Sequence, residues 1–268
     1  MRTILVTSGT KGGTGKSTIA LNLSVLMAYK LRSKAQYPVI LIDASVDSGS
    51  STMLLFGQSN PNVQYTLIDL LDGRTTDPPL SVLYLRQWQV NGDQFNIVFA
   101  ASGFSNLTRY RSLYPLSMLL NAIRSLSPIL TIIDSPAMGM TGGDIIEVTA
   151  PYLTDVIPVM TPDHSSIKAA KLAVNSIKAV NANINVLNPI LNMFDERYPP
   201  VDASTGIPWT EVAKGELGME PFVVPLDEYV QIARQALEIE VLKIGPLESK
   251  AVASMINYSN EVLGKLLQ

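Results

Sequence analysis

Short, almost wholly apolar runs alternate along the chain with segments in which apolar residues recur every three or four positions. Continuous apolar runs are typical of strands buried on both faces, and the longer spacing is typical of helices with one buried face. Strands are therefore expected at Thr3–Thr7, Val39–Asp43, Asn96–Ala100, Ile129–Asp134, Asp155–Met160, Val186–Met193 and Phe222–Pro225.

Helices are expected between these strands. In the first helix, apolar residues from Ile19 to Leu31 fall on one face. Further helices are predicted over Leu107–Ser125, Ser165–Val180, Tyr229–Leu237 and Leu247–Leu267. Such alternation predicts an α/β fold with a single doubly wound, mainly parallel sheet flanked by helices.

A hairpin is predicted at one edge of this sheet. Val82–Val90 and Phe95–Ala100 flank Asn91-Gly92, a pair that supplies the positive φ of a tight turn. We therefore expect one antiparallel edge strand.

The chain reads as one domain over residues 1–268, because no long linker or repeat divides it. Its least regular stretch is 195–218, which contains Tyr198-Pro199-Pro200, Gly206 and Trp209. Two interpretations stay open: an insertion that faces a partner, or a surface loop anchored by a packed Trp209.

Composition excludes several chemistries. The 268 residues include no cysteine, which excludes disulfides, thiolate zinc sites, iron–sulfur clusters and cysteine nucleophiles. His164 is the only histidine and is interpreted as a surface residue. The net charge of −3 gives no overall case for nucleic-acid binding. We expect a cytoplasmic protein, because we find neither a secretory leader nor a membrane span.

The segment Ser8–Thr18, SGTKGGTGKST, follows the first strand and opens the first helix. Glycines let backbone N–H groups approach a polyphosphate, and the helix N-terminus adds a positive dipole. Lys16 is expected to reach the β- and γ-phosphates, and Ser17 to ligate Mg²⁺. Thr10 stands where the strict phosphate-loop pattern G-x-x-x-x-G-K-[ST] has its first glycine. The alternative without a functional role is a glycine-rich turn with solvated lysines.

The run KGGTGKST, from Lys11 to Thr18, resembles the deviant Walker A motif of the ParA/MinD family of ATPases. VILIDASVDSGSSTMLLFG, residues 39–57, looks like the family's second motif and switch loop, and ILTIIDSPAMG, residues 129–139, looks like its Walker B motif and second switch. The resemblance implies a P-loop NTPase fold with ATP and Mg²⁺ as cofactors. It places ATP at Lys11, Gly12, Gly13, Thr14, Gly15, Lys16, Ser17 and Thr18, and the metal at Ser17, Asp43 and Asp134.

The resemblance extends to the adenine base. Asn192 falls where the family uses an asparagine to recognise adenine, and Pro225 and Asp227 fall in its base-binding loop. Pro-Leu-Asp after a strand is also ordinary helix-start chemistry. Both readings of Asp227 stay open.

The family's mechanism assigns catalytic roles to Lys11 and Lys16. In this family two subunits enclose two ATP molecules, and the residue corresponding to Lys11 crosses to the partner's phosphates. The resemblance thus implies a homodimer that forms with ATP, and a slow ATPase stimulated by a partner protein. Ser45 stands where the family usually has a water-orienting aspartate, so Asp47 takes this role in a shifted loop, or hydrolysis is weak. A plain turn aspartate is the alternative for Asp47.

Three functions stay open. The leading interpretation is a ParA-like switch in DNA segregation, nucleoid-associated if it binds DNA non-specifically; small basic clusters lie at Lys30–Lys34 and Arg109–Arg111. The second is a MinD-like positioning ATPase at a membrane or organelle partner. Membrane binding is disfavoured, because the end NYSNEVLGKLLQ carries Lys265 as its only basic residue. The third is a poorly hydrolysing, nucleotide-dependent scaffold.

Overall fold

The structure is a computed structural model. It describes residues 1–45, 49–59, 61–75, 79–103, 112–137, 142–195, 197 and 201–266, with backbone alone at 142–144. In these residues no helix is long and apolar enough to cross a membrane.

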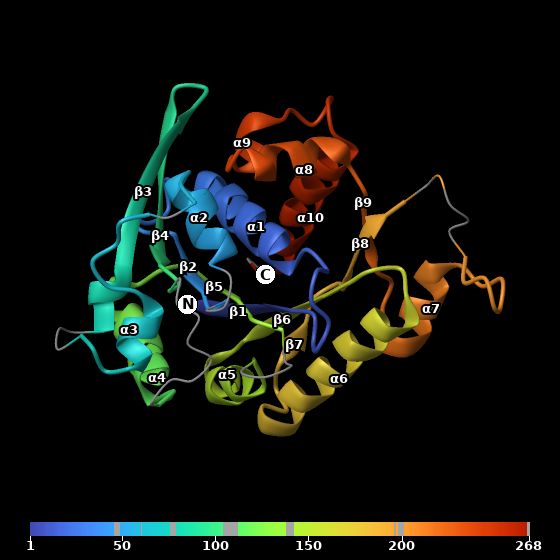
Figure 1. The fold of residues 1–268 in the computed structure, drawn as a ribbon, viewed down its shortest axis with the longest axis horizontal. Coiled ribbons are helices and arrows are strands. Elements are labelled where there is room, and N and C mark those ends of the chain that lie inside the picture. Colours follow the sequence, from blue (N-terminus) through green and yellow to red (C-terminus); the bar gives the residue numbers. More distant parts are fainter. Residues whose placement is uncertain are drawn as a thin grey trace.

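The described strands form one mainly parallel sheet, in the order β3-β4-β2-β5-β1-β6-β8-β9 with β7 paired to β6 (Figure 1). The predicted fold class is confirmed, because each predicted strand is found within a few residues of its place. The strands are β1 Arg2–Thr7, β2 Val39–Asp43, β3 Leu83–Val90, β4 Asp93–Ala100, β5 Leu130–Asp134, β6 Asp155–Met160, β7 Asn185–Val186, β8 Ile190–Phe194 and β9 Phe222–Pro225.

The predicted hairpin is confirmed at the edge of the sheet. β3 pairs antiparallel with β4, and Asn91 has the expected positive φ of 53°. The strand predicted over Val186–Met193 is instead two strands, β7 and β8. Pro189 lies between them and has no N–H to donate to a ladder.

Helices cover both faces of the sheet (Figure 1). One core cluster joins the sheet to α1, α2, α9 and α10, and the other joins it to α3, α4, α5 and part of α6. The helices are α1 Lys16–Leu31, α2 Ser50–Phe56, α3 Leu67–Leu71, α4 Tyr114–Ile123, α5 Gly142–Thr149, α6 His164–Val180, α7 Trp209–Leu217, α8 Glu228–Gln235, α9 Glu240–Lys243 and α10 Lys250–Leu266.

Two predicted helix boundaries move for local reasons. The helix predicted from Leu107 begins at Tyr114 in the described part of the chain, with Pro115 in its first turn, where a missing N–H costs nothing. The helix predicted from Leu247 begins at Lys250, because the Ser249 hydroxyl accepts from the N–H of Val252 at 3.1 Å.

The irregular stretch predicted over 195–218 is wrong in its second half, which is helix α7. The helix begins after Pro208 and ends at Gly218, whose φ of 73° suits a helix C-terminus. Trp209 packs edge-to-face on His164, with ring centroids 5.1 Å apart. This contact agrees with the anchored reading of Trp209.

The topology sets the site at the carboxyl ends of the central strands. β1 lies between β5 and β6, and β2 lies on the other side of β5, all parallel. Asp43 and Asp134 end β2 and β5 and are in register with each other. In sheets of this type ligands bind outside the carboxyl ends of the strands, at the point where strand order reverses.

Candidate functional site

The loop between β1 and α1 exposes its backbone where the sequence predicts a phosphate site. Gly15 directly precedes α1 with φ 83°, and a Cβ there would lie 2.2 Å from Nδ2 of Asn192. Around Gly12 and Gly13, by contrast, a Cβ would have no atom within 4 Å. The backbone of the loop is therefore open around Gly12 and Gly13, and it is closely packed against Asn192 at Gly15. This is the arrangement that lets N–H groups approach a polyphosphate.

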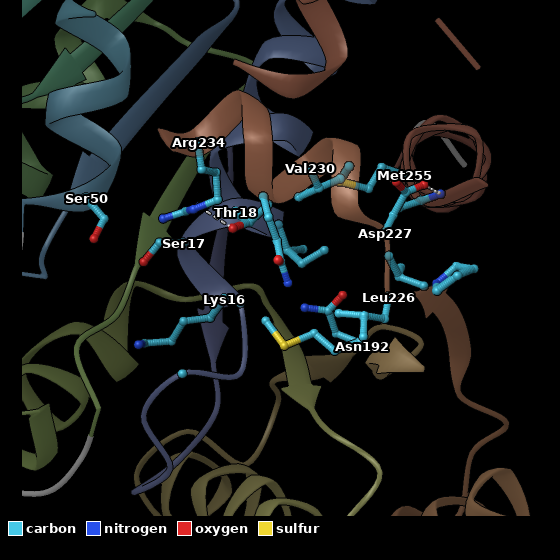
Figure 2. Close-up of a pocket in the computed structure, with 18 residues that line it drawn as sticks. Lys16, Ser17, Thr18, Ser50, Asn192, Leu226, Asp227, Val230, Arg234 and Met255 are labelled. Carbon is cyan, nitrogen blue, oxygen red and sulfur yellow. Dashed lines mark hydrogen bonds between the residues drawn. The ribbon is translucent and has the colours of Figure 1, made fainter. Parts of the chain in front are cut away.

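A cavity of about 400 Å³ adjoins this loop. Residues from α1, β8, β9, α8 and α10 line it, and Figure 2 shows their side chains converging. The predicted residues among them are Gly13, Gly15, Lys16, Ser17, Thr18, Asn192, Pro225 and Asp227. Most of the predicted ATP-binding residues thus meet in one place.

Two buried carboxylates, neither of which lines the cavity, lie side by side at the ends of β2 and β5. Asp43 accepts from the Thr52 N–H at 2.8 Å, the Thr52 hydroxyl at 2.7 Å and the Ser45 N–H at 3.2 Å. Burial, together with the neighbouring charge of Asp134, raises the pKa of Asp43 to about 7. Asp43 therefore fastens the start of α2 to the sheet. To act as a metal ligand it would exchange bonds that it makes within its own chain.

Asp134 has a different environment. Its Oδ2 accepts from the Ser51 hydroxyl at 2.9 Å, whereas its Oδ1 is buried without a hydrogen-bond partner. Burial raises the pKa of Asp134, while the Lys16 ammonium and the Ser17 hydroxyl oppose that rise. A free carboxylate oxygen near a serine hydroxyl suits the oxygen-preferring Mg²⁺ with its water shell. Asp134 and Ser17 thus fit the predicted metal role.

The three residues predicted to contact the base, Asn192, Pro225 and Asp227, all line the cavity. Asn192 is buried and donates its Nδ2 to the Thr14 carbonyl at 2.8 Å, so it braces the phosphate loop as well as lining the cavity. Asp227 accepts from the Tyr229 N–H at 3.0 Å and the Ser249 hydroxyl at 2.6 Å. Asp227 therefore has the helix-start role that was the alternative for it. Pro225 ends β9 at the cavity wall.

The two lysines of the phosphate loop, Lys11 and Lys16, lie in different environments. Lys16 lines the cavity, but Lys11 does not. The Lys11 ammonium donates to the Ser165 hydroxyl at 2.9 Å and lies 3.8 Å from Asp163, with 43% of its side chain exposed. Its own chain holds Lys11 outside the cavity, at the start of α6.

Part of the predicted switch lies outside the described residues. Asp47 belongs to this part, so its predicted role in orienting water stays a prediction. The same holds for Gly139 in the second switch and for the basic cluster Arg109–Arg111. Ser45 is described: it is buried, and its hydroxyl faces the Ser135 carbonyl at 3.4 Å.

Sequence reasoning missed several residues of the site. Arg234 lines the cavity and donates to the Thr18 hydroxyl, and Ser51 and Thr52 hold the two carboxylates. Arg234 could have been found from Asp227, because positions 227, 230, 231 and 234 have the spacing of one helix face, and all four line the cavity. The serine and threonine contacts had no comparable pattern.

The predicted basic cluster near Lys30 is engaged within the chain. Lys30 donates to the Ser259 hydroxyl, and Arg32 pairs with Asp93. α10 packs against α1 and β9, with Tyr258 and Val262 buried, so it is not a free amphipathic helix. These contacts give no support to a DNA-binding face or a membrane-binding helix in this part of the chain.

Comparison with known protein families identifies the type of site. Residues 5–210 match the model of the CobQ/CobB/MinD/ParA nucleotide binding domain. The chain belongs to this family. The resemblance to the ParA/MinD family is thereby confirmed, and so is the expectation of a nucleotide-binding domain with the P-loop fold.

Within the ParA/MinD family, relatives named MinD are prominent. A septum site-determining protein MinD of Oltmannsiellopsis viridis is 32% identical over 169 residues, which are 63% of this chain and 48% of that protein. This chain thus spans about half of that relative's length. A second MinD, from Mesostigma viride, is 29% identical over 193 residues, 70% of this chain and 61% of that protein.

Solved structures of family members share the fold. MinD of Pyrococcus horikoshii complexed with Mg-ADP superimposes with a TM-score of 0.69 at 22% identity and covers 97% of this chain and 95% of its own. The MinC:MinD cell division complex of Aquifex aeolicus gives 0.72 at 20% identity, covering 98% and 96%. The comparisons favour the MinD-like interpretation over the leading prediction of DNA segregation.

Proposed function

We propose that the chain is an ATP-dependent switch of the MinD type. It binds ATP with Mg²⁺, dimerises with a second copy in the ATP-bound state, hydrolyses ATP slowly and controls where a partner protein acts. The placement of Lys11 carries this proposal: in a loop with two lysines, Lys16 lines the chain's own cavity and Lys11 lies outside it. A cation in that position is available to a second molecule.

The residues of the site divide the work. Backbone N–H groups of the phosphate loop and the Lys16 ammonium hold phosphate oxygens, and Ser17 and Asp134 hold Mg²⁺ and its water. Mg²⁺ held there would supply positive charge beside the phosphates. Lys11 of one copy adds positive charge at the phosphates of the other, where charge develops during transfer, as an arginine finger supplied in trans does.

The type of partner is inferred from the relatives and from the surface. Two curated relatives are named as septum site-determining proteins, and one similar structure is a complex with MinC. Lys30 and Arg32 are engaged within the chain, which leaves little reason to expect a DNA footprint there. A partner protein is therefore favoured over DNA as the target of the ATP-bound dimer, and the same partner is expected to stimulate hydrolysis.

A co-sedimentation experiment tests this proposal. The protein is incubated with ATP, ADP or no nucleotide, then with duplex DNA or with anionic liposomes, and phosphate release is followed in parallel. We expect ATP binding and slow phosphate release, with no salt-sensitive retention on DNA. Retention on DNA that requires ATP and disappears at high salt would establish the DNA-segregation function instead. Failure to bind ATP would contradict both.

A further inference from the structure

Arg234 reaches the phosphate site from a part of the chain remote from the phosphate loop. It lies on α8, 216 residues after Thr18, and its guanidinium donates to the Thr18 hydroxyl (Figure 2). Its side chain is 31% exposed, so it lies partly in the cavity and partly against protein. Its positive charge also opposes, weakly, the rise in pKa that burial causes at Asp134. Arg234 therefore contacts the first turn of α1, directly after the phosphate loop.

A buried carboxylate lies on the other side of Arg234. Glu240 is fully buried at the start of α9, and its Oε1 lies 3.9 Å from the Arg234 guanidinium without any hydrogen-bond partner. Its Oε2 accepts from the Asn22 amide at 2.7 Å. Asn22 also donates to the Thr18 carbonyl at 2.8 Å, one turn earlier on α1. A nearby cation stabilises a carboxylate that is buried in this way, and the Arg234 guanidinium is the cation within ion-pair distance.

The order of side chains along α1 indicates which phosphate of a bound nucleotide Arg234 would face. Lys16 serves the β- and γ-phosphates and Ser17 the metal, so Thr18 is the next contact along the chain, towards the α-phosphate. After donating one hydrogen bond to the Thr18 hydroxyl, the Arg234 guanidinium has further N–H groups that could bind a phosphate. Among the ion pairs of the described residues, Glu240 is the one carboxylate that pairs with Arg234. The planar guanidinium forms strong, charge-assisted hydrogen bonds with phosphate oxygens.

We propose that Arg234 is a nucleotide-binding residue that contacts the α-phosphate, and that Glu240 is the positioning residue that holds it in place. This inference rests on the proposed binding of ATP and deepens it. It adds a cation, delivered from the C-terminal helices, to the lysine of the phosphate loop. It also means that a bound nucleotide would contact α8 through Arg234 and, through the pairing of Arg234 with Glu240, would be connected to α9.

Competition against a fluorescent ADP analogue tests this role in the full chain. Arg234→Ala is expected to weaken ADP and AMP about tenfold or more, since one charge-assisted hydrogen bond is lost. Adenosine, which has no phosphate, is expected to change less than twofold. Arg234→Lys keeps the charge and is expected to recover part of the affinity. Lys243→Ala is the matched control: it removes one positive charge, paired with Glu238 at 2.7 Å, from a residue that does not line the cavity.

Glu240→Gln separates positioning from direct contact. We expect it to weaken ADP in the wild-type background and to have no further effect in Arg234→Ala. The double variant Arg234→Gln/Glu240→Gln removes both charges together, so no charge remains buried alone if Arg234→Ala unfolds. It is expected to show the same loss for ADP and AMP.

The inference is overturned if Arg234→Ala and the double variant bind ADP as the wild type does. It is also overturned if adenosine is weakened as much as ADP, because a merely structural role predicts an equal loss. A wild type that binds ADP but never hydrolyses ATP would contradict the proposed switch and leave this result interpretable. A wild type that binds no adenine nucleotide would contradict both.

Discussion

Replacing Gly15 by alanine tests how closely the phosphate loop and Asn192 are packed. Gly15 has φ 83°, and a left-handed conformation costs an alanine about 1–2 kcal/mol. The new Cβ would lie 2.2 Å from Nδ2 of Asn192, so that amide must move and give up its bond to the Thr14 carbonyl. One such bond is worth about 0.5–1.5 kcal/mol. We expect the free energy of unfolding to fall by about 2 kcal/mol.

Urea denaturation of Gly15→Ala and Gly12→Ala measures this cost. Gly12 has no atom within 4 Å of its missing Cβ and does not have a positive φ, so Gly12→Ala is expected to leave stability unchanged or raise it by up to about 1 kcal/mol. The packing argument is refuted if Gly15→Ala is as stable as the wild type, or if the two variants lose stability equally.

Three other perturbations probe the switch. Asp163→Asn keeps a good helix N-cap but removes the charged partner of Lys11. An exposed pair is worth up to about 1 kcal/mol and each dimer gives up two of them, so the ATP-dependent dimer is expected to tighten by up to about thirtyfold in sedimentation. Burial raises the pKa of Glu240 above 4.5, so the folded state keeps the proton of this carboxyl to a higher pH than the unfolded state does. The wild type is therefore expected to lose stability relative to Glu240→Gln as pH rises from 4.5, measured by urea titration at each pH. Plots of unfolding free energy against pH that stay parallel for the two proteins would contradict this. Asp47→Ala is expected to abolish phosphate release while ATP still binds, and unchanged release would remove Asp47 from the mechanism.

Most of the sheet and the phosphate site could be predicted from local signals. A buried parallel strand is a short apolar run, and the glycine and lysine spacing of the loop directly specifies a strand–loop–helix turn. Asp43 and Asp134 were named as metal ligands from the resemblance to the ParA/MinD family, and the structure places them in register at the ends of β2 and β5. Local pattern was enough for the strands and the phosphate loop, and the resemblance supplied the two aspartates.

The rest depends on contacts between distant segments. Glu240 appears in the sequence as an ordinary helix residue, and only the tertiary structure buries it against Asn22, 218 residues away. The bond from Ser51 to Asp134 likewise joins residues far apart in sequence. The attachment of Lys11 to Ser165 depends on where α6 begins relative to the phosphate loop. No periodicity along the chain records such pairings.

The mass of the protein in solution tests the central claim most directly. Sedimentation equilibrium is measured with ATP and Mg²⁺, with ADP and Mg²⁺, and without nucleotide, for the wild type and for Lys11→Ala. Lys11 does not line the cavity of its own chain, so this variant is expected to keep its affinity for ATP. The account predicts a dimer for the wild type with ATP alone and a monomer for Lys11→Ala in every condition. A wild type that stays monomeric with bound ATP, or a Lys11→Ala variant that dimerises equally well, would contradict it.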